Sequence, residues 1–127
     1  MREHLELYAG IRCISLEVRE SVIRHKMGEL DLARYERVQA GTLSGGNKRK
    51  LSTAIATLSN PKVIFLDEPS TGMDPEARRF MWDVISRITP QKKQSSIVLT
   101  THVMEEAEAL CTKIGIMVNG GLTCLGR

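Results

Sequence analysis

Short apolar runs and amphipathic segments alternate along the second half of the chain. Residues 63–66 and 96–101 are runs with little polar alternation, which predict strands covered on both faces. Between them, apolar residues recur with helical spacing after Pro75, and proline is favoured in the first turn of a helix. A strand, a helix and a strand in this order predict a right-handed crossover between two parallel strands.

The pattern continues to the end of the chain. A helix is predicted over 104–111, a third strand over 114–118 and a fourth strand over 122–125. Asn119, Gly120 and Gly121 between the last two strands predict a turn of the hairpin type. The polar segment 89–95 is predicted to be a loop.

The first half of the chain has helical periodicity instead. Apolar residues spaced by three and four positions predict helices over 2–12, 17–30, 32–37 and 48–59. Asn60 and Pro61 end the last of them. The change in pattern predicts a helical subdomain over 1–59 and an α/β part over 60–127.

The helix near residue 48 has an unusual beginning. Ser44 can cap the helix, and Gly45 and Gly46 leave backbone N–H groups bare, so a phosphate oxygen could approach them. An ordinary turn is the alternative explanation of these residues. Three cations follow, and we interpret them as solvated rather than as direct ligands of an anion: Lys48, Arg49 and Lys50.

Composition excludes several classes of function. The chain has 127 residues with a net charge of +3, which does not indicate a nucleic-acid surface. Its three cysteines have unrelated spacings and indicate reduced thiols rather than a metal site. No apolar run approaches the roughly 20 residues of a membrane span. No secretory signal precedes the first helix.

Three polar side chains follow the two predicted parallel strands. Asp67 and Glu68 end the first strand, and His102 follows the second. The carboxyl ends of parallel strands meet at one edge of a sheet, where ligands bind, so these side chains are expected to lie together. An acidic pair in this place can hold hydrated Mg²⁺ and position a water molecule for phosphoryl transfer. Alternatively, the two carboxylates cap the turn that follows.

Four segments in order resemble the motifs of ATP-binding cassette (ABC) proteins. The segment 43–47 resembles the signature loop and 63–68 the Walker B strand with its catalytic glutamate. The segment 70–74 looks like the D-loop, and His102 looks like the switch histidine. The sequences of segments 45–52 and 65–75 are similar to those of the A subfamily of ABC transporters. That subfamily is largely concerned with moving lipids.

The sequence departs from the ABC pattern in two respects. Asn47 replaces the glutamine of many members, as is common in the A subfamily. No Gly-x-x-x-x-Gly-Lys-Ser/Thr sequence is present, so the P-loop is missing, as are the adenine-stacking aromatic residue and the glutamine loop. The chain therefore resembles the C-terminal part of a nucleotide-binding domain, an incomplete P-loop NTPase fold of the α/β class with the Walker B half of a mainly parallel sheet.

The resemblance implies a mechanism for the complete domain. Two cassettes close head to tail on two ATP molecules, and each signature loop completes the site of its partner. Asp67 would hold a water on Mg²⁺, Glu68 would polarise the attacking water, and His102 would contact the γ-phosphate. The remaining implied contacts are those of Asp74, which would bridge the cassettes, and of the signature residues with the opposite ATP: Ser44, Gly45, Gly46 and Asn47.

The implied function is ATP hydrolysis that drives transmembrane transport. The expected partners are ATP, a second cassette and the transmembrane domains, and the expected location is the cytosolic face of a membrane. Nucleic acid is not expected as a partner. Two alternatives stay open: a soluble ABC ATPase acting on ribosomes or DNA, and a truncated, non-catalytic cassette that serves only in interactions. The 127 residues alone are expected to be inactive and to bind ATP weakly.

Overall fold

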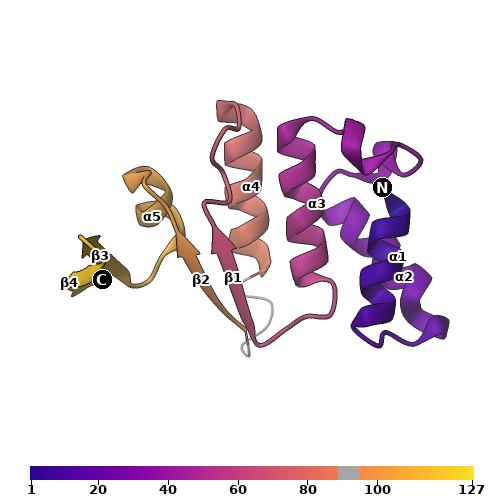
Figure 1. Cartoon of the computed structure of the whole chain (residues 1–127), viewed down its shortest axis with the longest axis horizontal. Helices are drawn as coiled ribbons and strands as arrows, with labels where there is room; N and C mark the ends of the chain where they lie inside the picture. The colour runs from indigo at the N-terminus through magenta and orange to yellow at the C-terminus, as the bar shows by residue number, and fades with distance from the viewer. Residues whose placement is uncertain (89–94) are drawn as a thin grey trace.

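The computed structural model describes residues 1–88 and 95–127. Its first half is helical, as the sequence predicts, and Figure 1 shows these helices grouped at one end of the molecule. The helices in chain order are α1 (Arg2–Ile11), α2 (Leu16–Glu29), the short 3₁₀ turns η1 (Ala33–Tyr35) and η2 (Ala40–Thr42), and α3 (Gly45–Thr57).

The second half alternates strands and helices. The elements are β1 (Val63–Asp67), α4 (Pro75–Ile88), β2 (Ser96–Thr100), α5 (Met104–Leu110), β3 (Ile114–Val118) and β4 (Gly121–Gly126). Strands β1 and β2 are parallel, in register from Val63 opposite Ser96 to Asp67 opposite Thr100. The predicted strand–helix–strand order with parallel strands is confirmed. The loop predicted over 89–95 lies, apart from Ser95, outside the described residues.

The helical half has a core of its own. Arg2 of α1 forms ion pairs with Glu20 of α2 and with Glu36 beyond η1, which ties these segments together at the surface. Val84 of α4 completes this core from the α/β half. The other buried residues of the core are Met1, Leu5, Ala9, Ile23, Met27, Leu30, Leu32, Leu43, Leu51, Ala54 and Leu58.

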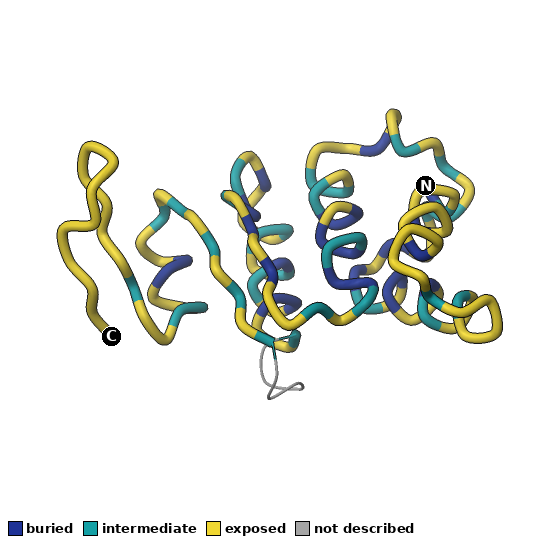
Figure 2. Tube along the Cα trace, turned by 60° about the horizontal axis from the view of Figure 1, so that its bottom comes forward, coloured by how far each residue is buried: buried dark blue, intermediate teal, exposed yellow. Residues whose placement is uncertain are grey.

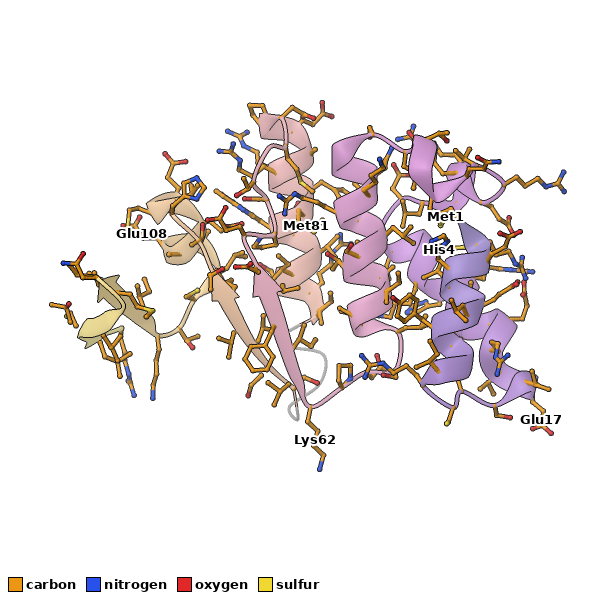
Figure 3. The ribbon with its side chains drawn as sticks, in the orientation of Figure 1. Met1, His4, Glu17, Lys62, Met81 and Glu108 are labelled. Carbon is orange, nitrogen blue, oxygen red and sulfur yellow. The ribbon has the colours of Figure 1, made fainter. Side chains whose placement is uncertain are left out.

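A second apolar cluster lies between the β1–β2 sheet and α4. Ile64 and Leu66 of β1 pack with Met81 and Ile85 of α4 and with Met73. Met81 is fully buried, and its sulfur lies 3.8 Å from the hydroxyl oxygen of Thr53 in α3. Figure 3 labels this methionine in the interior of the molecule. Helix α4 therefore contacts both α3 and the sheet.

The prediction that both faces of the strands are covered is wrong for this chain. Burial alternates along β1, and the exposed fractions are 50% for Val63, 75% for Phe65 and 50% for Val98 of β2. The run is apolar on both sides, yet the described residues supply a covering helix on one side only. An apolar sheet face therefore remains exposed to solvent.

Strands β3 and β4 form a separate antiparallel hairpin. Asn119 and Gly120 have φ angles of 49° and 79°, the left-handed pair that a tight two-residue hairpin turn requires. The predicted turn is confirmed, although Gly121 already belongs to β4. All residues of β4 are exposed, and Figure 2 shows the hairpin almost entirely in the colour of exposed residues. Among the described helices, none has the length and apolar character of a membrane span.

Candidate functional site

The carboxyl edge of the β1–β2 sheet brings together the polar residues predicted there. The parallel register places Asp67 beside Thr100, and the Thr100 hydroxyl donates a hydrogen bond to Oδ1 of Asp67. Glu68 follows at once, and its Oε1 lies 3.1 Å from Nδ1 of His102. Asp67, Glu68 and His102 therefore share one edge of the sheet, as predicted.

The backbone at Glu68 has a strained conformation. Its φ angle is 44°, in the left-handed region that a residue with a side chain enters at a cost of about 1–2 kcal/mol. Its N–H donates to the Thr100 carbonyl oxygen at 3.0 Å, and the Thr100 hydroxyl oxygen lies 3.2 Å away. Its carbonyl oxygen accepts hydrogen bonds from Thr71 N at 3.2 Å and from Nη1 of Arg49 at 2.6 Å. Neighbours on three segments thus hold this conformation.

The Glu68 carboxylate is also held from two sides. The Thr71 hydroxyl donates to Oε2 at 2.9 Å, while His102 contacts Oε1. The hydrogen bond from Thr71, followed by that from His102, lowers the pKa of Glu68 below its ordinary value. The carboxylate is ionised at neutral pH, as that of an ordinary glutamate is, and its oxygens can accept hydrogen bonds. The contact with Thr71 also fits the alternative in which Glu68 caps the turn, and the two roles are compatible in this geometry.

Helix α3 begins at Gly45, three residues before the start predicted from apolar periodicity. The Ser44 side chain caps it by accepting a hydrogen bond from Asn47 N at 3.3 Å. Periodicity could not find this start, because the first turn contains no apolar residue. The predicted cap at Ser44 is confirmed.

Gly45 and Gly46 have no packing reason to be glycine. A Cβ added at either position meets no heavy atom within 4 Å, and neither residue has a positive φ angle. Glycine in a helix reduces stability by roughly 0.5–1 kcal/mol relative to alanine. The space beside both glycines leaves their backbone open to a group that approaches from outside.

The helix start lines an open hollow of about 550 Å³ together with the segment before α4. Asp74 lies on the opposite side and caps α4, because its Oδ1 accepts a hydrogen bond from Ala77 N at 2.9 Å. The hollow brings the signature-like residues and Asp74 together, whereas Asp67 and His102 do not line it. Other lining residues include Asp31, Arg34, Tyr35, Lys50, Gly72, Met73, Glu76 and Phe80.

The interpretation of the three cations as solvated is wrong for two of them. Lys50 is 8% exposed, and its ammonium lies 4.0 Å from the centroid of the Phe80 ring, in a cation–π contact. Arg49 is half-buried and donates to the Glu68 carbonyl oxygen. Only Lys48 is exposed as expected. Charge pattern alone could not predict these contacts, because they arise from the packing of α3 against α4 and the segment after β1.

The oxygen donors at the sheet edge fit a hydrated magnesium ion. Asp67 is an exposed carboxylate with a hydroxyl beside it, and hard oxygen donors are the ligands of Mg²⁺. No group of three or more His, Cys, Asp or Glu residues able to hold a metal occurs within the described ranges. This donor set suits an ion that keeps its waters and takes its remaining ligands from phosphate.

Comparison with known proteins shows the family to which the chain belongs. A family model described as "AAA domain, putative AbiEii toxin, Type IV TA system" matches residues 9–106. Human ATP-binding cassette sub-family A member 2 is 56% identical over 125 residues, and the human retinal-specific phospholipid-transporting ATPase ABCA4 is 52% identical over the same length. Each match covers 98% of this chain and 5% of the relative.

A solved structure of an ATP-binding subunit of an ABC transporter has the same fold. It superposes with a TM-score of 0.84 at 28% identity, over 98% of this chain and 51% of that one. The chain belongs to the AAA-domain family of ATPases. More narrowly, it is part of an ABC nucleotide-binding domain of the A-subfamily type, with the incomplete α/β fold predicted from its sequence.

Proposed function

We propose that the complete protein hydrolyses ATP as a nucleotide-binding cassette and uses the free energy to move a lipid across a membrane. The observation that carries this proposal is the grouping of Asp67, Glu68 and His102 at the carboxyl edge of β1 and β2. The lipid is proposed because one relative bears the name of a phospholipid-transporting ATPase. The cassette would lie on the cytosolic face, bound to transmembrane domains.

In this mechanism Glu68 orients the attacking water. Its carboxylate is ionised at neutral pH, so an oxygen can accept a hydrogen bond from water as the water attacks the γ-phosphate. His102 lies against the same carboxylate and would reach the γ-phosphate with its ring. Asp67 would hold a magnesium-bound water, and the ion, when bound, would neutralise charge on the phosphates.

The signature residues would serve a second ATP molecule, anchored on a partner cassette. Gly45 and Gly46 would present bare N–H groups to its γ-phosphate at the positive end of the α3 dipole. Ser44 and Asn47 flank these groups, and Asp74, across the hollow, would contact the partner. These roles, and the division into a helical subdomain over 1–59 and an α/β part over 60–127, belong to the proposal.

A single substitution in the complete protein tests the enzymatic part. Glu68→Gln removes the negative charge and keeps the shape of the side chain. We expect the rate of ATP hydrolysis to fall by about 100-fold or more, while ATP binding changes by less than about two-fold. Phosphate release and equilibrium binding of a labelled ATP would be measured on the same preparation. Unchanged turnover would remove Glu68 from the mechanism and favour a cassette that serves only in interactions.

A further inference from the structure

Arg49 joins two parts of the chain that the proposed mechanism assigns to different ATP molecules. It lies in α3, in the turn that follows Ser44, Gly45 and Gly46. Its guanidinium reaches the carbonyl oxygen of Glu68, 19 residues later in the sequence. The Nη1–O distance of 2.6 Å is short for a hydrogen bond from nitrogen, as is typical when the donor is charged.

The contact acts on the residue whose geometry matters most. Glu68 has a left-handed backbone, and the direction of its side chain depends on that conformation being kept. Of the groups that bind its main chain, Thr71 is a neighbour in sequence and Thr100 belongs to the adjacent strand. Arg49 binds the Glu68 main chain from α3, so a displacement of α3 would directly shift the Glu68 backbone.

The stretch of α3 that carries Arg49 is itself packed against its surroundings. Arg49 is half-buried, and its carbonyl oxygen accepts a hydrogen bond from the hydroxyl of Thr53 one turn later, at 3.1 Å. The next residue, Lys50, is buried against Phe80 of α4. This stretch of α3 is therefore packed rather than free, and it can transmit a shift of the helix.

We propose that Arg49 is a positioning residue for Glu68, and that it couples the signature end of α3 to the catalytic carboxylate within one chain. The inference rests on the proposed function. Binding of the partner's ATP at Gly45 and Gly46 would fix α3, and Arg49 would then fix the backbone at Glu68. ATP bound at one site would in this way affect the geometry of the catalytic glutamate at the other site.

The test uses steady-state ATP hydrolysis by the complete protein. Arg49→Met keeps the apolar stem and removes the donor, and Lys48→Met removes an equal charge from the exposed neighbouring position. We expect Arg49→Met to lower kcat by about ten-fold with KM changed by less than about two-fold, because misplacement rather than loss of binding is the defect. Lys48→Met should leave both constants within about two-fold of the parent protein.

A double substitution shows whether Arg49 acts through Glu68. In a Glu68→Gln background, Arg49→Met should leave the residual rate unchanged, since the group that it positions is already lost. The same ten-fold loss in both backgrounds would overturn the inference, as would an unchanged kcat in the single variant. Where Arg49→Met fails to fold, Arg49→Lys replaces it, with a reduced kcat and an unchanged KM expected and a parental kcat overturning the inference.

The Glu68→Gln variant separates this inference from the proposed function. If Glu68→Gln abolishes hydrolysis and Arg49→Met does not reduce it, only the positioning role fails. If Glu68→Gln itself has no effect, the proposed catalytic site fails and the positioning role fails with it.

Discussion

At the scale of single residues, the Glu68 carboxylate is held by two side chains, those of Thr71 and His102. Thr71 donates to one of its oxygens and His102 contacts the other. The contact with His102 is available only while the histidine is not engaged elsewhere. If the ring turns towards a phosphate, as proposed, the Thr71 hydrogen bond and the charge of Arg49 remain to lower the pKa of Glu68.

Replacement of Thr71 by valine should therefore move the pH dependence of hydrolysis. Loss of the hydroxyl removes the largest cause that lowers the pKa of Glu68, so this pKa rises towards its ordinary value. The base is active when ionised, so its activity is lost as the pH falls through that pKa, and the acid limb of the kcat profile should shift to higher pH. The shift is measured from initial rates in a series of buffers.

Thr112→Val provides the matched control, because Thr112 is exposed and lies after α5. Its acid limb should coincide with that of the parent protein. Coincidence of the Thr71→Val profile with the parent profile would contradict the role of this hydrogen bond.

The sequence could predict those site residues whose positions follow from local pattern, and it could not predict contacts between residues far apart in the chain. Ser44, Asp67, Glu68 and His102 lie at helix starts or strand ends, so local pattern and parallel topology were enough to place them. Arg49 reaches Glu68 only because α3 packs beside the segment after β1. Such a contact leaves no local signal.

At the scale of elements, helix α5 positions His102, because α5 begins two residues after the histidine. Its buried residues are Glu106 and Ala107. Glu106 is 1% exposed, and its Oε1 accepts a hydrogen bond from Nε1 of Trp82 in α4 at 2.9 Å. A carboxylate buried to this degree requires its partner, so the Trp82–Glu106 hydrogen bond anchors α5 to α4.

Trp82→Phe should loosen α5. The substitution removes the N–H donor and leaves Glu106 buried without it, which costs about 1–3 kcal/mol. We expect faster amide exchange in 104–110 and a lower melting temperature of the cassette, measured by hydrogen–deuterium exchange and calorimetry.

Glu106→Gln is the companion variant for this contact. The amide keeps an acceptor oxygen for Trp82, so its effect should be smaller than that of Trp82→Phe. Equal protection of α5 in the Trp82→Phe and parent proteins would show that the hydrogen bond does not anchor the helix.

Helices and strands were predictable over most of the described chain, although the helix predicted over 32–37 is only the 3₁₀ turn η1 and the 3₁₀ turn η2 was not predicted. The coverage of the strands was not predictable. The apolar run at 63–66 correctly indicated a strand, but the expectation that both of its faces are covered was wrong. The surrounding chain determines whether a second layer covers the other face of the sheet. The apolar run itself does not indicate whether that layer is present. Phe65 is exposed for this reason, although its sequence context is that of a core residue.

At the scale of the whole molecule, the exposed sheet face is a liability when the 127 residues stand alone. Val63, Phe65 and Val98 present apolar side chains on one face of a two-stranded sheet that also has free edges. Apolar faces and unpaired strand edges promote association between chains. We therefore expect the isolated chain to aggregate.

Phe65→Thr should increase the soluble fraction of the isolated chain by about two-fold or more, because it removes exposed apolar area and keeps a residue that favours strands. Soluble and pelleted protein would be quantified after lysis and by size-exclusion chromatography. Leu16→Thr is the control, since Leu16 is 77% exposed but lies in α2. An equal gain from both variants would assign aggregation to general apolar exposure rather than to the sheet face.

The empty space around Gly45 and Gly46 has a consequence for engineering. Alanine fits at both positions without touching an atom within 4 Å and favours a helix over glycine. A selection for thermostability alone would accept alanine at these positions, and the residue preferences of ordinary helices also favour it. If the proposed role holds, such a variant would have lost the surface that the phosphate of the partner's ATP approaches. Stability and activity would then oppose each other at these two positions, and an assay with both cassettes would reveal the loss.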